Sequence, residues 1–194
     1  MQNPHGNRER GQDSTDTILL SGGIDSATAL ALAVNTKRSL SALFIDYGQP
    51  AAARESAASV AVATHYQVPH RSLRAGSLAF GSGEIRGRNA FLVHLAMLAA
   101  PAKSGALILA IHAGTPYRDC SLEFAKLMQQ SLDFHTSGEL VVAVPFVAMT
   151  KSEVYQVASR LEVPIQLTYS CEAGISPCGV CLSCMDREAL LAST

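Results

Sequence analysis

TILLSGGIDS, residues 17–26, decides the fold of this chain. Its apolar start predicts a strand over residues 17–20, and the Ala- and Leu-rich stretch that follows predicts a helix over residues 25–34. Between them, Gly22 and Gly23 let the backbone approach a ligand closely. The first turn of a helix also presents free N–H groups and a partial positive charge. The segment therefore predicts a phosphate-binding loop.

The other residues of this segment strengthen the prediction. Ser21 and Ser26 add hydroxyl donors, and Leu20, Ile24 and Asp25 complete the expected nucleotide-binding stretch. It is not a Walker A motif, because no Gly-Lys-Ser/Thr follows. The alternative is an ordinary strand-to-helix turn, with glycine at the bend and Asp or Ser as the cap. The complete string favours phosphate binding, with Ser21, Asp25 and Ser26 as candidate catalytic residues.

Short apolar runs alternate with helical patterns along the whole chain. This alternation predicts an α/β fold with a Rossmann-like parallel sheet and helices on both faces. Ligands of such sheets bind beyond the carboxyl ends of the strands, and Ser21, Asp46, His112 and Pro145 each follow a predicted strand. The predicted strands are residues 17–20, 40–45, 68–73, 106–111 and 140–144, and the predicted helices are residues 25–34, 51–64, 89–100, 122–132 and from 150 to just before Pro164.

Two cationic side chains lie at helix starts, a position that a bound anion would explain. Arg88 lies just before one predicted helix, and Lys151 follows Thr150 at the start of another, where Glu153 completes a capping-box pattern. The helix dipole disfavours cations at these positions. A solvated surface charge is the alternative for each, but both are candidates for contacting phosphates.

Length and composition limit the possible functions. The 194 residues favour one domain with a small appendage. The net charge of -1 gives no footprint for nucleic acid, and no apolar run approaches the ~20 residues that span a bilayer. Residues 1–16 are polar and lack the apolar core of a secretory signal. We expect a cytoplasmic protein with a flexible tail over 1–16, an α/β body over 17–165, a metal-binding segment over 166–194, and no direct binding of nucleic acid or membrane.

Four of the five cysteines form one cluster. Cys171, Cys178, Cys181 and Cys184 fall within fourteen residues, which favours a metal over disulfides in a reducing compartment. Four thiolates close the tetrahedral shell of Zn²⁺, so the site is expected to be structural. An iron–sulfur cluster is the alternative.

The motifs, taken in order from about residue 19 to residue 190, resemble those of the QueC family of 7-cyano-7-deazaguanine synthases, within the PP-loop ATP pyrophosphatases. Their order and spacing are more specific than either the loop or the cysteine cluster alone. The matching pieces are LLSGGIDSATAL (19–30), FIDYGQ (44–49), GRN (87–89), Tyr117-x-Asp119-Cys120 with Glu123-Phe124, Thr150-Lys151, and YSCEAGISPCGVCLSC (169–184) followed by Arg187.

The resemblance implies an adenine nucleotide alpha hydrolase-like fold and an ATP-dependent C–N ligase. The expected reaction is adenylation of 7-carboxy-7-deazaguanine and its conversion by ammonia to the 7-cyano product of queuosine biosynthesis. ATP, Mg²⁺ and structural Zn²⁺ are the expected cofactors, and a homodimer is the expected assembly. The resemblance assigns ATP to the loop with Asp46, Tyr47, Gly87, Arg88 and Lys151, and the deazapurine to Asn89, Tyr117, Asp119 and Cys120.

The chain also departs from the family pattern on its substrate side. Pro50 and Ala51 stand where the family has a basic residue and His, the loop before Asp119 is shorter, and Ser121 replaces an Arg. One alternative is therefore a QueC-like ligase that joins the activated acid to an amine of a partner molecule or protein, for example in a defence system. Others are a tRNA-modifying sulfur transferase, for which only Cys120 is spare, and a non-catalytic zinc-stabilised module. For Cys120, a small buried hydrophobe is equally consistent with the sequence.

Overall fold

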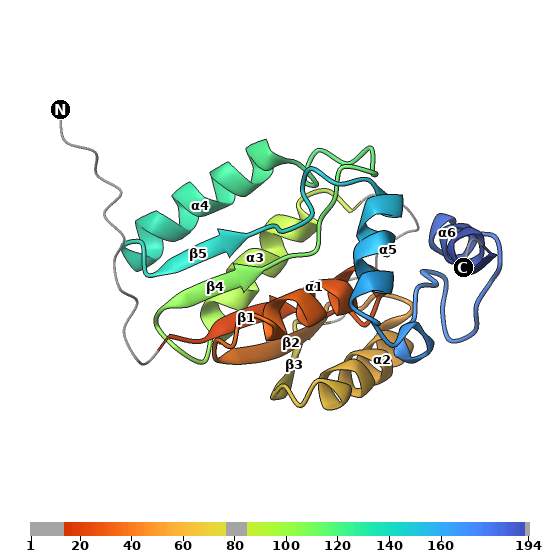
Figure 1. Ribbon diagram of the computed structural model, residues 1–194. Coiled ribbons are helices and arrows are strands. Elements are labelled where there is room, and N and C mark those ends of the chain that lie inside the picture. Colours follow the sequence, from red (N-terminus) through yellow and green to blue (C-terminus); the bar gives the residue numbers. More distant parts are fainter. Residues whose placement is uncertain (1–13, 77–84, 193–194) are drawn as a thin grey trace.

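The computed structural model describes residues 14–76 and 85–192. A five-stranded sheet in which every pairing is parallel forms its centre, with the strand order β3-β2-β1-β4-β5 (Figure 1). The order reverses direction at β1 and β4, so the carboxyl ends of these two strands form the topological switch point. The strands are β1 (Asp16–Leu19), β2 (Leu40–Asp46), β3 (His70–Arg74), β4 (Gly105–Ile108) and β5 (Leu140–Ala143).

Helices cover both faces of the sheet, as the alternating pattern predicts. On one face α1, α2 and α5 pack over the core that contains Ile18, Ala42 and Ile108, and on the other α3 and α4 pack over Leu43 and Leu107 (Figure 1). Adjacent strand residues thus enter opposite cores, as the pleat requires. The helices are α1 (Ile24–Val34), α2 (Ala52–His65), α3 (Arg88–Ala99), α4 (Leu122–Thr136), α5 (Lys151–Arg160), the 3-10 turn η1 (Ile165–Leu167) and α6 (Leu182–Ala192).

The sheet is fixed at its amino edge by Asp16, the first residue of β1. Its side chain accepts a hydrogen bond from Arg38 Nε at 2.6 Å and another from the backbone N–H of Ala106 at 2.7 Å. One carboxylate thereby joins β1 to β4 and to the segment that leads into β2. The strand begins one residue earlier than its apolar run predicts, because Asp16 is buried in this contact.

Two of the differences between the predicted and the observed elements concern the cavity and the C-terminal segment. The predicted strand over residues 106–111 ends at Ile108. The amide of Leu109 still donates to the Ala143 carbonyl at 2.9 Å, and residues 109–111 line a cavity. Helix α6 is not predicted from the sequence, and its one buried residue is Cys184. The division between residues 165 and 166 stays a prediction, and η1 crosses it.

Candidate active site

A cavity of about 490 Å³ opens at the carboxyl edge of the sheet, where the strand order reverses. Segments far apart in the sequence form its walls: the loop after β1, the residues that follow β2 and β4, and the starts of α3 and α5. The predicted site residues that line it are Leu20, Ser21, Gly23, Ile24, Asp25, Ser26, Tyr47, Arg88, Asn89, Tyr117, Asp119, Cys120 and Lys151.

The loop from Ser21 to Ser26 leaves the first turn of α1 open. Gly23 is the N-cap in extended conformation, and no side chain caps the helix. No Asp or Ser side chain therefore caps α1, and the first-turn amides remain available to an anion. The hydroxyls of Ser21 and Ser26 lie 3.1 Å apart, and Ser26 Oγ also donates to the carbonyl of Gly23 at 3.0 Å.

Gly22 packs closely against α2, whereas the sequence analysis explained this glycine by the close approach of a ligand. Its φ is +84°, and an added Cβ would lie 2.5 Å from the carbonyl oxygen of Glu55 and 2.9 Å from the amide nitrogen of Ser59. A side chain at this position would collide with α2. The missing side chain thus seats the loop against a neighbouring helix, and Gly22 is not among the residues that line the cavity.

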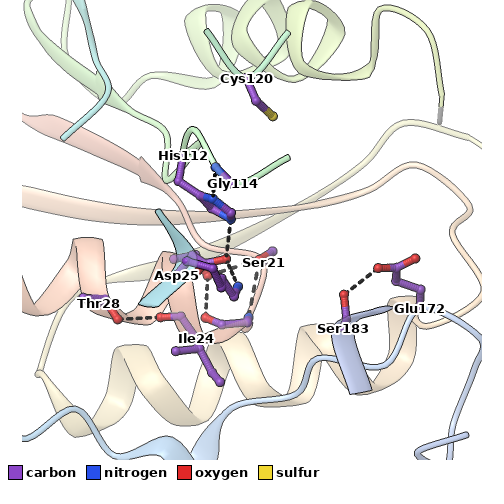
Figure 2. A network of polar contacts seen from close by, with 12 residues as sticks. Ser21, Ile24, Asp25, Thr28, His112, Gly114, Cys120, Glu172 and Ser183 are labelled. Carbon is purple, nitrogen blue, oxygen red and sulfur yellow. Dashed lines mark hydrogen bonds and ion pairs between the residues drawn. The ribbon is translucent and has the colours of Figure 1, made fainter. Parts of the chain in front are cut away.

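Asp25 lies at the centre of a polar network (Figure 2). Its Oδ2 accepts from Lys151 Nζ at 2.5 Å and lies 3.7 Å from His112 Nε2. Its Oδ1 is buried without a hydrogen-bond partner among the described residues. Carboxylate oxygens are preferred ligands of Mg²⁺, so this unpartnered oxygen beside the phosphate loop fits a divalent cation.

His112 is a buried residue to which the sequence analysis gave no role. The backbone N–H of Gly114 donates to its Nδ1 at 3.0 Å, so the neutral ring carries its proton on Nε2, which faces Asp25. Burial lowers the pKa of His112; Asp25 acts in the opposite direction and Lys151 adds to the lowering. An added Cβ at Gly114 would lie 3.0 Å from His112 Nδ1 and 3.1 Å from the Lys151 amide nitrogen, so glycine permits this packing.

A second polar group forms the wall beyond β2. Gln49 Nε2 donates to Glu55 Oε2 at 2.7 Å, and Gln49 Oε1 accepts from the amide of Tyr47 at 3.0 Å. Burial raises the pKa of Glu55, while the Gln49 hydrogen bond opposes the shift. Burial also raises the pKa of Tyr47, against the nearby charge of Arg88. Arg88 thus stands on the β2 side of the cavity, whereas Lys151 reaches it from α5.

The predicted substrate residues lie together at the start of α3. Asn89 Nδ2 donates to the carbonyl of Asp119 at 3.1 Å and lies 3.8 Å from Cys120 Sγ. The amide of Asn89 donates weakly to the Asp119 carboxylate at 3.4 Å. Burial raises the pKa of Cys120, so its sulfur is a thiol at neutral pH. It lines the cavity, on the side of His112 away from the phosphate loop (Figure 2).

Two further predicted nucleotide-binding residues do not line the cavity, and their roles stay predictions. The carboxylate of Asp46 accepts from Arg74 Nε at 3.2 Å and from the Gly48 amide at 3.0 Å. Gly87 has φ +77° and precedes α3. Of the departures from the family, Ser121 has a structural role, because it caps α4 by accepting from the Phe124 amide.

The four clustered cysteines can hold one metal ion. Their sulfur atoms all lie within 4.8 Å of one another, and tetrahedral Zn–S bonds of ~2.3 Å require a separation of roughly 3.8 Å. Burial acts to raise the pKa of Cys171, but hydrogen bonds from the amides of Ala173 and Cys178 lower it to about 6. Burial raises the pKa of Cys184 to about 12. The donor set therefore fits a thiophilic metal that displaces protons on binding.

Residues 171–184, which carry the four cysteines and are called the cysteine segment below, also form one wall of the cavity. The sequence analysis did not predict this wall. Glu172 accepts a hydrogen bond from Ser183 on this wall (Figure 2). The sequence signal that points to this wall is Tyr169, an aromatic residue two positions before Cys171. The lining residues from this part of the chain are Tyr169, Ser170, Glu172, Leu182, Ser183, Asp186, Arg187 and Leu190.

Comparison with known proteins agrees with this arrangement. The family profile described as "Queuosine biosynthesis protein QueC" matches residues 16–83 and 80–194. The chain belongs to the QueC family. Among its relatives, the 7-cyano-7-deazaguanine synthase of Synechococcus sp. (strain RCC307) is 34% identical over 92% of this chain and 94% of the relative. The synthase of the same name from Parasynechococcus marenigrum (strain WH8102) is 31% identical over 91% and 92%.

The QueC family match spans both the loop and the cysteine cluster. Within residues 14–76 and 85–192, no helix has the length and apolar character needed to cross a membrane.

Proposed function

We propose that this QueC family protein is an ATP-dependent enzyme that adenylates the carboxylate of 7-carboxy-7-deazaguanine and uses ammonia to form the 7-cyano product. One observation carries the proposal. A single cavity is lined by the uncapped loop, by Lys151 and Arg88, and by the predicted deazapurine residues Asn89, Asp119 and Cys120. Relatives named for this reaction match more than nine-tenths of the chain.

The loop supplies the nucleotide side of the reaction. The first-turn amides of α1 and the hydroxyls of Ser21 and Ser26 donate to the phosphates. The substrate carboxylate attacks the α-phosphorus, the bond to the β-phosphate oxygen breaks, and pyrophosphate leaves. Lys151 exchanges its contact with Asp25 for a phosphate oxygen, where its charge offsets the charge that develops on the leaving group.

Asp25 is the residue that would hold Mg²⁺. When bound, the ion would neutralise phosphate charge and orient the pyrophosphate. The buried Oδ1 supports this assignment, because it has no hydrogen-bond partner in the described part of the chain. His112 Nε2 faces the other oxygen and keeps the carboxylate oriented once Lys151 moves.

The opposite wall holds the deazapurine acid. Asn89, Asp119 and Cys120 line this wall, with Arg88 nearby to pair with anionic groups. Ammonia attacks the acyl adenylate and AMP leaves, which gives an amide. A second adenylation on the amide oxygen, followed by loss of both protons from the nitrogen and departure of AMP, gives the nitrile. The chain contributes mainly positioning and charge stabilisation.

Mass spectrometry of the products tests the proposal. The protein is incubated with ATP and 7-carboxy-7-deazaguanine, with and without ammonium. Nitrile and AMP that form only with ammonium support it, with two AMP released per nitrile. An amide or a protein adduct without nitrile would instead support the ligase that joins the acid to an amine. Absence of AMP under every condition would contradict both.

The Asp25→Asn variant tests the site directly. It keeps the size of the side chain but removes the charge that pairs with Lys151 and would hold the cation. AMP release should fall by about 100-fold or more, as expected for the loss of a charged group in the transition state. Asp133→Asn, on the exposed face of α4, is the matched control and should retain full activity. Activity of Asp25→Asn equal to that of the control would remove Asp25 from the mechanism.

The proposal also covers the identity of the bound metal and the oligomeric state. We assign Zn²⁺ to the four cysteines, so elemental analysis should find about one zinc per chain. Iron in its place would support the cluster alternative. The homodimer stays a prediction that light scattering can test.

A further inference from the structure

Tyr169 connects the cysteine cluster to the phosphate loop. Its backbone N–H donates to the carbonyl oxygen of Gly22 at 2.9 Å, although the two residues are far apart in the sequence. Its own carbonyl oxygen lies 3.6 Å from the position of a Cβ built on Gly23. The backbone before the first cysteine is therefore laid against the loop that is proposed to bind pyrophosphate.

The side chain of Tyr169 faces the cysteine segment. The ring is buried in one apolar cluster with Ala51, Ala58, Cys171 and Cys184. Its hydroxyl donates to the carbonyl of Gly174, which lies between the first two cysteines. Ala51 is one of the residues at which the chain departs from the family, and here it is buried against the metal-binding segment.

Arg54 lies over the ring of Tyr169. Its guanidinium carbon lies 5.2 Å from the centre of the Tyr169 ring, a distance suited to a cation–π interaction. Arg54 belongs to α2, the helix against which Gly22 packs. The loop, α2 and the cysteine segment thus meet at one aromatic side chain.

Helix α6 is tied to the same stretch of backbone. Arg187 donates to Thr168 Oγ1 at 2.7 Å and to the Ile165 carbonyl at 2.9 Å. Between Cys171 and the start of α6 the backbone forms no regular secondary structure. Its conformation therefore depends on the sulfur atoms and these few contacts, and a metal ion would supply most of its order.

We propose that Tyr169 is a positioning residue that couples occupancy of the four-cysteine site to nucleotide binding at the Ser21–Ser26 loop. Metal binding orders the segment, the segment holds Tyr169, and its N–H fixes the Gly22 carbonyl so that the loop is preorganised. The inference rests on the proposed function, because it takes ATP as the ligand. Linkage requires the converse effect, so nucleotide must raise the affinity for the metal by the same factor.

The reciprocal effect can be measured without turnover. Protein loaded with Zn²⁺ is titrated with a chelator of known zinc affinity, with and without α,β-methylene ATP, whose methylene bridge prevents the proposed cleavage. We expect nucleotide to tighten zinc binding by a factor in the range of roughly 5–150, the usual size of such coupling. Nucleotide that binds with no change in zinc affinity would overturn the inference and leave the proposed function intact. Failure of the zinc-loaded protein to bind nucleotide would overturn both.

Variants separate positioning from a merely structural role. Tyr169→Leu should bring the coupling factor close to one while retaining about one zinc per chain. Tyr169→Phe keeps the ring that packs against the cysteines, so it should restore most of the coupling. Phe134→Leu, at an exposed position on α4, is the control and should leave the factor unchanged. Coupling that persists in Tyr169→Leu would contradict the assignment.

Arg54→Gln gives a second test if Tyr169→Leu does not fold. Arg54 is exposed, so this change should preserve the fold while removing the contact over the ring. A coupling factor below that of the unmodified chain supports the role of Tyr169. A factor equal to it, in a folded and zinc-loaded variant, contradicts it.

Discussion

The two sides of the cavity are built in different ways. The loop after β1 continues from a buried strand into a helix, so regular backbone hydrogen bonds fix both of its ends. The wall formed by the cysteine segment is irregular, and its buried anchors are Tyr169, Cys171 and Cys184. The chemistry is expected to reside on the first side, while the second side gives the cavity a wall whose order depends on four sulfur atoms.

Lys151→Met should have the largest effect, and it should act on the sheet side alone. Removal of the charge beside Asp25 should lower kcat for AMP release by about 100- to 1,000-fold, the usual cost of one transition-state donor. Zinc content should not change. Lys126→Met, on the exposed face of α4, is the matched control. A loss of zinc in Lys151→Met would show that Lys151 also supports the cysteine segment.

Cys184→Ser should act on the wall formed by the cysteine segment. Loss of a buried ligand should reduce zinc content and lower the free energy of unfolding by ~2 kcal/mol or more, or roughly 4–8 °C in Tm for a chain of this length. Hydrogen exchange should show lost protection in α6 with protection retained in β1, β2 and β4. Cys120→Ser, which lies outside the cluster, should keep its zinc. Full protection of α6 in metal-free Cys184→Ser would show that the metal is dispensable for its order.

Two glycines with positive φ, one on each side of the cavity, allow the cost of an added side chain to be compared. Gly22 has φ +84° and is crowded by α2, whereas Gly179 has φ +73° and nothing within 4 Å of an added Cβ. Both alanine variants incur a left-handed backbone cost of about 1–2 kcal/mol. Gly22→Ala should add about 1–3 kcal/mol from overpacking. Chemical denaturation measures the difference, and equal destabilisation would mean that α2 moves aside without cost.

Arg187→Gln should have the smallest effect. It removes two hydrogen bonds between α6 and the backbone before Tyr169, so local opening of α6 should become easier by ~1 kcal/mol. Hydrogen exchange of α6 amides gives the measurement. Arg160→Gln, at the exposed end of α5, is the control. Unchanged exchange would show that the cysteines alone hold the helix.

The sheet side could largely be predicted from the sequence because its signals are local. Strand periodicity, the glycine pair and the capping box at Thr150 each fall within a few residues, and the structure contains the corresponding elements. The residues around Asp25 come from α1, α5 and the stretch after β4, and the rule for carboxyl edges of parallel sheets anticipates their meeting.

The other side could not be predicted in the same way, for a physical reason. Helix α6 packs no apolar stripe against the main core, and its one buried residue is a cysteine. Tyr169 reaches Gly22, 147 positions away in the sequence, only after the chain has folded. Contacts between distant segments of this kind leave no periodic signal.

The clamp formed by Asp16 has a practical consequence. It secures the point where the chain enters the sheet, at the edge opposite the cavity, through partly buried contacts with Arg38 ahead of β2 and with β4. A surface tether attached ahead of Thr15 would pull on a strand that Asp16 anchors to its neighbours, and it would leave the mouth of the cavity facing solution. Immobilised protein prepared in this way should suit binding sensors that follow nucleotide and metal in the same sample.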